Sequence, residues 1–498
     1  MLQNLSKLAV LSITKVNKLK NAFFWSFLTN YLGIGVNFLS VVLLARMLTP
    51  SEIGTYAIAG AIFAIAQIFR DMGISGYLLR EKELTPIKLS GAMTIVWLLC
   101  TSISLLLLLA SLPLAAFYSI PELTTIFQIL CLNIFLIPCG TIAQTHLRRA
   151  MRFKALGAIE LTSQIIHLIV ALILAYNSFG AVSLAIASLS ATICTLLLVN
   201  IAYKGKKQFA LNFANANIVL PSISTIGLAN ILTTLNNRVT PLIIGKSISE
   251  NAVAIMDKAL ATIELLNQLL MQAIQKVLLP YFTKIREDKG NINEAYLLVT
   301  NYTLLFALPF LFYISVLSEF VVLTLFGDQW VDAIPLVPIF ALSSAFGMTV
   351  RYFGEITISL GLEKILMRVN LTVFVIKVVA ILIVSSYGLF AVGYSILAIS
   401  ILRTFYILSL IKSYMNIGYF LFLQNTAKTF LVSFISAIPY FIGNIYNVPF
   451  TKAVEVIILF VTVVIAWLTS IFIVNHKARH DISILLKPIV NRSLLRKE

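Results

Sequence analysis

The chain has 498 residues, of which 59% are hydrophobic and 11% are charged. Soluble domains carry roughly 25% charged residues, so this composition excludes an ordinary soluble protein and is typical of a chain that crosses a membrane many times. The formal net charge of +17 is compatible with nucleic-acid binding, but the distribution of the cations argues against that class.

Apolar stretches long enough to cross a bilayer follow one another along the whole chain. A transmembrane helix needs about 20 mostly apolar residues. Fourteen such stretches cover residues 21–44, 53–72, 89–112, 123–145, 157–176, 180–202, 218–244, 252–279, 295–317, 333–357, 366–386, 388–411, 427–446 and 453–474. We therefore predict an all-α polytopic membrane protein with about 14 transmembrane helices.

Lysine and arginine gather in alternate connections between these stretches. The cation-rich connections precede the first span and follow the second, fourth, sixth, eighth, tenth and twelfth, and the C-terminal tail is also basic. The opposite connections hold only Arg46, Lys246 and Lys452. This positive-inside asymmetry predicts cytoplasmic termini and an even number of spans. It explains the net charge without a nucleic-acid partner.

Neither a processed leader nor a metal site is predicted. The N-terminus lacks the short apolar core and small-residue cleavage site of a signal peptide, and we expect residues 2–20 to form a cytoplasmic surface helix. All four cysteines lie inside apolar spans, where we interpret them as small core residues rather than disulfides or metal ligands. They are Cys100, Cys131, Cys139 and Cys194.

Two polar interruptions, 200 residues apart, resemble one another. Residues 43–56 read LLARMLTPSEIGTY and residues 243–256 read IIGKSISENAVAIM; we call them the first seam and the second seam. Each is an apolar run closed by one cation, followed by a polar break and a new apolar run. The first seam ends span one and the second ends span seven. This spacing predicts two six-span halves, related by an axis along the membrane normal, and two further spans.

On this division the chain has five parts and no soluble domain. They are a cytoplasmic N-terminal segment (1–20), a six-helix bundle (21–205), a second six-helix bundle (218–412), two additional transmembrane helices (427–475) and a basic cytoplasmic tail (476–498). The longest connection on the outer side, about 318–332, is too short for a folded extracellular domain.

Five segments in order carry a resemblance to a known family. They are the first seam, AQIFRDMGIS (66–75), THLRRAMRFKALGAIE (145–160), LPYFTKIRED (279–288) and LFGDQWVDAIPLV (325–337). They resemble the bacterial polysaccharide-transport family of Wzx-type oligosaccharide flippases, in the multidrug/oligosaccharidyl-lipid/polysaccharide exporter superfamily. The resemblance covers about residues 20–370; the last hundred residues match only in hydropathy.

The resemblance implies a fold, a cargo and a location. The fold is two bundles in a MATE-like arrangement around a central cavity that opens alternately to each side of the bacterial inner membrane. The cargo is an undecaprenyl-pyrophosphate-linked sugar repeat unit for O-antigen, capsule or exopolysaccharide. Such a protein performs no chemistry, so no catalytic residue and no cofactor is expected. Coupling to a proton or sodium gradient is implied, and a polysaccharide polymerase and a chain-length regulator are the protein partners expected.

Cations lie deep within the predicted spans. On insertion scales each costs roughly 3 kcal/mol, so each should face a partner or a wet cavity. We predict that they bind the pyrophosphate and that nearby amides bind glycan hydroxyls, although interhelical hydrogen bonding is an alternative for the amides. The predicted substrate-binding residues are Lys258, Lys377, Arg238, Arg351, Arg403, Asn37 and Asn237.

Lys258 matches a cation that in related flippases contributes to phosphate binding; the alternative is that it extends to the outer interface. Its neighbour Asp257 is expected to point elsewhere, because consecutive helical residues are about 100° apart. Arg351 and Glu355 are four residues apart and are expected to pair on one helix, which competes with ligand contact. Arg238 departs from the family, which more often has a small polar or acidic residue there.

The remaining two deep cations have different surroundings. Lys377 lies near the centre of span eleven and is expected to face the cavity or a carboxylate. Arg403 lies nearer the cytoplasmic end of span twelve, where its side chain can reach the interface instead.

Four residues are predicted to act in coupling or gating. Glu160 and His167 are seven apart, hence on nearly one helix face, and form either a proton relay or a structural pair. Arg70 and Asp71 end span two and form either a gate or a packing pair.

Arg46 and Lys246 occupy equivalent places in the two seams, at the predicted outer mouth of the cavity. They contact either the departing pyrophosphate or, as interfacial anchors, headgroups and the carbonyls at a helix end.

Three other functions compete with lipid-linked oligosaccharide transport. A multidrug or small-solute exporter of the same fold needs fewer cavity cations, because typical drugs are cationic. A membrane glycan polymerase needs a larger outer loop for its catalytic residues. A scaffold without transport leaves the deep charges unexplained.

Overall fold

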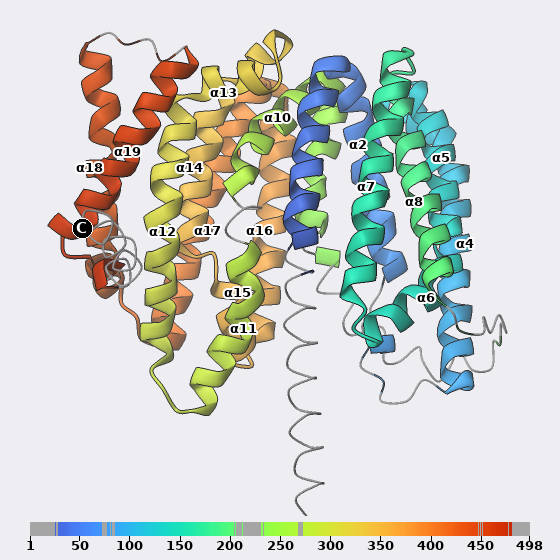
Figure 1. The fold of residues 1–498 in the computed structure, drawn as a ribbon, viewed down its shortest axis with the longest axis horizontal. Helices are drawn as coiled ribbons and strands as arrows, with labels where there is room; N and C mark the ends of the chain where they lie inside the picture. The colour runs from blue at the N-terminus through green and yellow to red at the C-terminus, as the bar shows by residue number, and fades with distance from the viewer. Residues whose placement is uncertain are drawn as a thin grey trace, which may run out of the picture. The chain divides into compact units, whose positions relative to one another are not determined.

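The computed structural model describes residues 28–71, 77–79, 85–203, 231–232, 234–266, 272–446, 452–476 and 478–480, together with residues 25, 81, 205, 212, 448 and 450. Over these ranges every regular element is a helix (Figure 1). The predicted all-α membrane fold is confirmed.

The chain divides into two compact units, residues 1–255 and residues 256–498. Unit 1 contains the helix Leu28–Met47, α2 (Pro50–Asp71), α4 (Pro86–Tyr118), α5 (Glu122–Leu136), α6 (Pro138–Arg149), α7 (Phe153–Tyr176), α8 (Val182–Ala202) and a helix over 234–247. Because the boundary falls inside α10 (Glu250–Leu266), that helix belongs to both units. The predicted division into six, six and two spans stays a prediction.

Unit 2 continues from α10 to the end of the described chain. It contains α11 (Gln272–Glu287), α12 (Ile292–Val316), α13 (Ser318–Leu325), η2 (Asp328–Ala333), α14 (Leu336–Thr349), α15 (Phe353–Ser359), α16 (Glu363–Val384), η3 (Ser385–Tyr387), α17 (Leu389–Met415), α18 (Tyr419–Ile445) and α19 (Ala453–Ile473). The outer connection expected near 318–332 therefore folds into α13 and η2, which close back on one another.

Helix α4 illustrates how the sequence forms a spanning helix. Thr85 caps it by accepting a hydrogen bond from the Lys88 amide at 3.4 Å, and Pro86 occupies the first turn, where its missing N–H costs nothing. The helix ends where Ser119 adopts a left-handed conformation. Its 33 residues are apolar on every side, and the outward-facing leucines suit a lipid surround rather than water.

Eleven helices of the described chain are long and apolar enough to cross a membrane. A twelfth span results if α5 and α6, which are bent by 49° where Pro138 follows Ile137, are counted together. The exact count of 14 stays a prediction, because four of the expected spans, 21–44, 53–72, 218–244 and 252–279, fall partly outside the described residues.

One predicted span is interrupted. The stretch expected at 333–357 is α14 and α15, and the backbone between them, Val350 to Tyr352, leaves helical geometry. Leu336–Ser359 as a whole is still long and apolar enough to cross a membrane, so the predicted span is retained although its helix is interrupted. The buried aromatic rings of Tyr352 and Phe353 follow the break and pack in the core of unit 2 with Phe282 and Tyr296.

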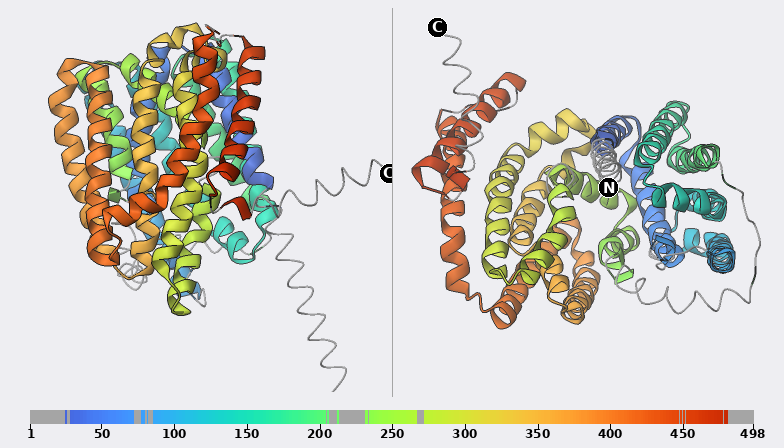
Figure 2. Two further views of the ribbon diagram at one scale, coloured as in Figure 1. Left: turned by 90° about the vertical axis from the view of Figure 1, so that its left-hand side faces the viewer. Right: turned by 60° about the horizontal axis from the view of Figure 1, so that its bottom comes forward.

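The last two helices pack on the rest of unit 2 through α12, and both views of Figure 2 place α18 and α19 side by side. A buried polar chain joins them. The Ala478 amide donates to Nδ1 of His476 at 3.1 Å, so Nε2 carries the proton and donates to the Thr429 hydroxyl at 2.9 Å. That hydroxyl donates to Oδ1 of Asn301 at 3.1 Å.

Candidate functional site

Three basic side chains lie on adjoining elements of unit 2. Lys377 lies on α16, Arg403 on α17, and Arg351 in the break between α14 and α15. Helix α17 packs against both α14 and α16. The elements that carry Arg351 and Lys377 thus adjoin the helix that carries Arg403. We call these three residues the cation series.

Two members of the cation series, Lys377 and Arg403, lie far from the ends of their helices. At 1.5 Å per residue, Lys377 is about 21 Å along α16 from Glu363, and Arg403 is about 18 Å along α17 from Met415. Both residues thus lie at similar depth, near the middle of a membrane about 30 Å thick. Arg403 is exposed, whereas Lys377 and Arg351 are partly buried. A guanidinium exposed at that depth needs a wet or polar surround.

A carboxylate and an amide flank the arginine end of the series. Oε1 of Glu355 accepts a hydrogen bond from Nε2 of Gln275 at 2.5 Å, which links α15 to α11. Because the helix breaks at Val350–Tyr352, Arg351 and Glu355 do not share a helix as the sequence predicted. Tyr352, next to Arg351 in sequence, is buried, and its hydroxyl shares a hydrogen bond with Oγ1 of Thr303 at 2.8 Å.

Lys258 is enclosed rather than open to a ligand. It is only 5% exposed, and its ammonium lies 5.4 Å from the centroid of the Trp330 ring and 5.9 Å from that of Phe326. Its Nζ is 3.4 Å from Oδ2 of Asp257. The prediction that Asp257 points away was wrong, because the long lysine side chain turns back toward its neighbour. We call Asp257, Phe326 and Trp330 the Lys258 cage.

The aromatic part of this cage was not predicted from the sequence. Phe326 and Trp330 come from the end of α13 and from η2, and both are fully buried. They belong to the LFGDQWVDAIPLV segment that carries the family resemblance. That segment identified the residues, but nothing in the local pattern indicated that they meet a lysine some 70 residues earlier in the chain.

The two seam cations differ in their surroundings. The Lys246 ammonium donates a hydrogen bond to the backbone carbonyl of Phe117 and lies 4.6 Å from the centroid of its ring. This carbonyl is in the last turn of α4, where carbonyl groups lack helical partners and carry partial negative charge. Of the two predicted roles, carbonyl capping therefore has a structural basis at Lys246. Arg46 is exposed in the equivalent seam.

The other predicted substrate residues are exposed within unit 1. Arg238 and Asn237 lie on the helix over 234–247, and Asn37 lies on Leu28–Met47. Their exposure leaves these side chains accessible to a ligand, and their roles stay predictions.

The predicted coupling residues are spread over two helices. Glu160 is exposed and His167 partly buried on α7, and the contacts of the described residues include none between the two side chains. Arg70 and Asp71 end α2, and their side chains lie outside the described part of the structure. Coupling and gating by these residues stay predictions.

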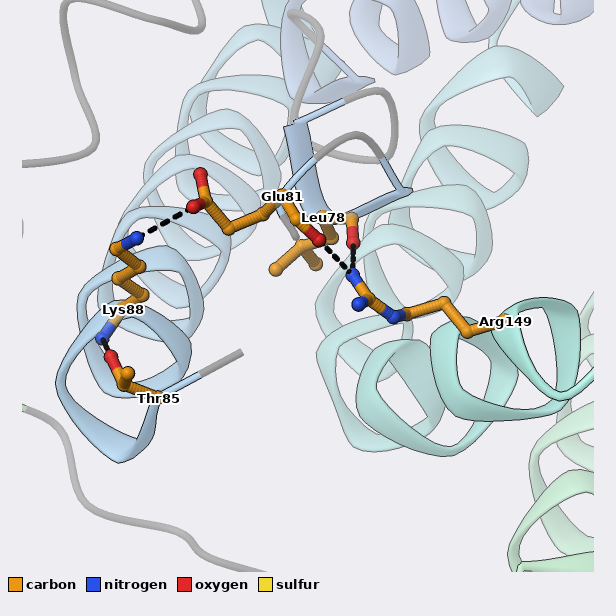
Figure 3. Close-up of polar contacts among 5 residues, drawn as sticks. All are labelled: Leu78, Glu81, Thr85, Lys88 and Arg149. Carbon is orange, nitrogen blue, oxygen red and sulfur yellow. Dashed lines mark hydrogen bonds and ion pairs between the residues drawn. The ribbon is translucent and has the colours of Figure 1, made fainter. Parts of the chain in front are cut away.

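Arg149 holds a backbone segment that no sequence pattern indicated (Figure 3). From the end of α6, its Nη1 donates to the carbonyls of Leu78 and Glu81 at 2.8 and 2.6 Å. The Glu81 carboxylate in turn pairs with Lys88 of α4 at 2.6 Å. One guanidinium thus ties the connection between α2 and α4 to α6. The sequence had counted Arg149 only among the loop cations.

Comparison with known proteins identifies the family. A family model described as polysaccharide biosynthesis protein matches residues 43–335, more than half of the chain. The chain belongs to this family. The resemblance carried by the five segments to a polysaccharide-transport family is thereby confirmed. Both seams and the Lys258 cage fall within the matched residues, whereas the cation series lies beyond them.

A relative in the family and two solved structures are similar to this chain. The succinoglycan biosynthesis transport protein ExoT of Rhizobium meliloti is 25% identical over 327 residues, which are 64% of this chain and 65% of ExoT, slightly under two thirds of that relative. The lipid II flippase MurJ in an inward closed conformation aligns with a TM-score of 0.71 and 16% identity over 94% of this chain and 99% of MurJ. An inward-facing multidrug resistance MATE family transporter aligns with a TM-score of 0.59 and 14% identity over 79% of this chain and 94% of the transporter. At these identities the two structures establish the fold alone, and the predicted MATE-like fold is confirmed.

Proposed function

We propose that this protein moves undecaprenyl-pyrophosphate-linked oligosaccharide repeat units across the bacterial inner membrane by alternating access, for the assembly of O-antigen, capsule or exopolysaccharide. The headgroup of such a lipid carries a pyrophosphate and a hydrated glycan, neither of which crosses hydrocarbon unaided. The polyprenyl tail never leaves the hydrocarbon. The protein therefore has to supply cations and hydrogen-bonding groups across the membrane's depth.

The observation that carries this proposal is the cation series at mid-membrane depth. Three cations on adjoining elements within the membrane are unfavourable unless an anion, a polar partner or water offsets their charge. Arg403 has no ion-pair partner among the residues that the structure describes. A pyrophosphate that crosses the membrane meets the requirement, because it brings two negative charges to the depth where these cations lie.

The other predicted residues complete the proposed path. Lys258 binds the pyrophosphate after leaving its cage, and Arg238, Asn37 and Asn237 contact the headgroup. Arg46 and Lys246 act at the mouth, and Glu160, His167, Arg70 and Asp71 act in coupling or gating.

The proposed setting follows from the loop charges and from the family. We place both termini in the cytoplasm, because the cation-rich connections are on their side. A proton or sodium gradient supplies the energy, and a polysaccharide polymerase and a chain-length regulator work with the protein.

A small-solute exporter of the same fold is the second proposal, and the likeness to the MATE transporter favours it. Drug substrates are commonly cationic, however, and the cation series disfavours binding them. A glycan polymerase is less well supported, because the outer connection folds into the short elements α13 and η2.

The test is transport in proteoliposomes. The purified protein is reconstituted with an undecaprenyl-pyrophosphate oligosaccharide that carries a fluorophore on the glycan. An impermeant reductant then quenches the fluorophore only in the outer leaflet. We expect wild-type protein to make the inner pool accessible to the reductant. Arg403→Gln should slow this step by about 10- to 100-fold, since a hydrogen bond to a charged group contributes about 1.5 to 3 kcal/mol.

Arg368→Gln is the matched control. Arg368 is an exposed residue near the start of α16, and its replacement should leave the rate unchanged. Wild-type protein that transports a cationic drug but not the lipid-linked glycan would contradict the proposed function. A normal rate in Arg403→Gln would contradict the role of the cation series.

A further inference from the structure

A proline interrupts the backbone hydrogen bonding of α12 within its predicted span. Pro309 has no N–H, so the carbonyl of Leu305, four residues earlier, lacks its helical donor. Leu305 is fully buried, and the membrane interior offers no water to such a carbonyl. Helix α19 supplies a donor instead, because Nε1 of Trp467 donates to the Leu305 carbonyl at 3.0 Å. A side chain of the last helix thus replaces the hydrogen bond that the proline removes.

Helix α18 holds α12 on either side of this proline. Before Pro309, the Thr429 hydroxyl of α18 donates to Oδ1 of Asn301 at 3.1 Å. After it, the Tyr313 hydroxyl of α12 donates to the carbonyl of Ser436 in α18 at 2.7 Å. Helices bend most readily at a proline, so contacts on both sides of it fix the bend. We call these two contacts and the indole hydrogen bond the α12 brace.

The opposite face of α12 holds the backbone break beside the cation series. Oγ1 of Thr303 shares a hydrogen bond with the hydroxyl of the buried Tyr352 at 2.8 Å. Thr303 and Leu305 are two residues apart, which places them about 200° apart around the helix. Helix α12 also packs against α14, which ends at the break. A change in the bend of α12 therefore acts on α19 at one face and on the break at the other.

The backbone hydrogen bonds at the break itself are long. The amides of Val350, Arg351 and Phe353 donate to carbonyls at 3.3, 3.5 and 3.2 Å, respectively. The usual distance is about 2.9 to 3.0 Å, so these bonds fix the backbone weakly. The hydrogen bond between Thr303 and Tyr352 is shorter. Helix α12 thus contributes directly to where Arg351, the residue before Tyr352, is placed.

We propose that Trp467 is a positioning residue for the cation series. By holding the Leu305 carbonyl, it fixes the bend of α12. Through the hydrogen bond between Thr303 and Tyr352, this bend sets the position of Arg351. The inference rests on the proposed function, in which Arg351 binds the pyrophosphate. It assigns a task to the last two helices, which set the geometry of a site that other helices carry.

A double-mutant cycle in the proteoliposome assay tests this chain of contacts. Trp467→Phe removes the indole N–H and keeps an aromatic ring beside Phe306, whose centroid is 5.1 Å away. We expect it to raise the KM for the fluorescent glycolipid about 2- to 30-fold, the range for residues that act on a site from a distance, with a smaller effect on the maximal rate. In an Arg351→Gln protein the same change should leave the KM unaltered, because no cation remains to be positioned.

The control is Trp97→Phe, which changes a tryptophan of α4 whose ring packs edge-on against Phe135, and it should leave the KM unchanged. A general loss of packing would raise the KM in both backgrounds. Equal effects of Trp467→Phe in the wild-type and Arg351→Gln proteins would therefore contradict the positioning role.

Hydrogen exchange of the purified protein needs no substrate, so it separates failure of this inference from failure of the proposed function. In Trp467→Phe we expect the amides of residues 350–353 to exchange about tenfold faster than in the wild type. Pro309→Ala restores a backbone donor to the Leu305 carbonyl, so adding Trp467→Phe to it should cause no further change. Unchanged exchange at residues 350–353, or an equal acceleration with and without Pro309, would overturn the proposal even if no glycolipid is transported.

Discussion

Replacing Lys258 with methionine removes a buried charge and keeps a flexible side chain of similar length. The change separates two roles for this lysine. In one role, the Lys258 cage is a structural device and the lysine never leaves it. In the other, the cage stores a cation that moves to the pyrophosphate during transport. The two roles predict different combinations of stability and activity.

The structure gives the expected change in stability. Loss of the contacts with Trp330 and Phe326 costs about 0.5 to 2 kcal/mol each. The pair with Asp257, whose side chain is 55% exposed, contributes at most about 1 kcal/mol. Removing the charge from a predicted span recovers roughly 3 kcal/mol. These terms nearly cancel, so we expect the folded protein to change in stability by less than about 2 kcal/mol.

The assay combines thermal unfolding of the purified variant with transport of the fluorescent glycolipid. We expect Lys258→Met to be as abundant and nearly as stable as wild type but about 10- to 100-fold slower in transport, the range for one charged hydrogen bond. Lys412→Met is the control, because this exposed lysine also lies near an aromatic ring, that of Tyr419 at 5.3 Å. A stable and fully active Lys258→Met protein would refute substrate binding, and an unfolded one would make the cage structural.

Two further variants test contacts that the sequence did not indicate. Arg149→Ala removes two charged hydrogen bonds to the Leu78 and Glu81 carbonyls, each contributing about 1.5 to 3 kcal/mol. We expect proteolysis of the connection between α2 and α4 to become about tenfold faster or more. Arg148→Ala, which changes an exposed neighbouring residue, should leave the rate of proteolysis unchanged. Thr429→Val interrupts the buried chain from His476 to Asn301 and should lower stability to thermal unfolding by about 1 to 3 kcal/mol. The control is Thr469→Val, because the exposed hydroxyl of Thr469 donates only to carbonyls of its own helix, and this change should alter thermal stability little. Equal losses of thermal stability in the two variants would contradict the importance of the buried polar chain.

Local patterns were sufficient for the helices and for the seams. Long apolar runs bounded by caps and prolines, such as the one that Thr85 and Pro86 begin, require only the sequence of the run itself. The repeat was visible because each seam has its polar break at the same place. Thr49 and Glu52 cap each other's backbone amides in the first seam, and Ser249 caps the Ala252 amide in the second.

Those local patterns could not predict which residues on different helices contact one another. The cage of Lys258 depends on how η2 folds back, and the break at Val350–Tyr352 removed the helical spacing from which the Arg351–Glu355 pair was predicted. The cation series depends on the rotation of α16 and α17 about their axes, which apolar helices without a clear polar face do not encode.

The deep cations differ in what offsets the free-energy cost of placing their charge within the membrane. The charge of Lys258 is stabilised inside the protein by a carboxylate and two aromatic rings. In the enclosed state this charge therefore requires no bound ligand to stabilise it. Arg403 is exposed within the predicted span, on a helix that packs against the elements next to Arg351 and Lys377. An anion that arrives there lowers the free energy of the protein as well as its own, by up to the several kcal/mol that the repulsion and exposure cost. Within the proposed function, the cation series therefore binds the pyrophosphate first. Lys258 binds it only in a state in which α10 has moved. This order explains why a transporter would keep one deep cation enclosed and leave another exposed.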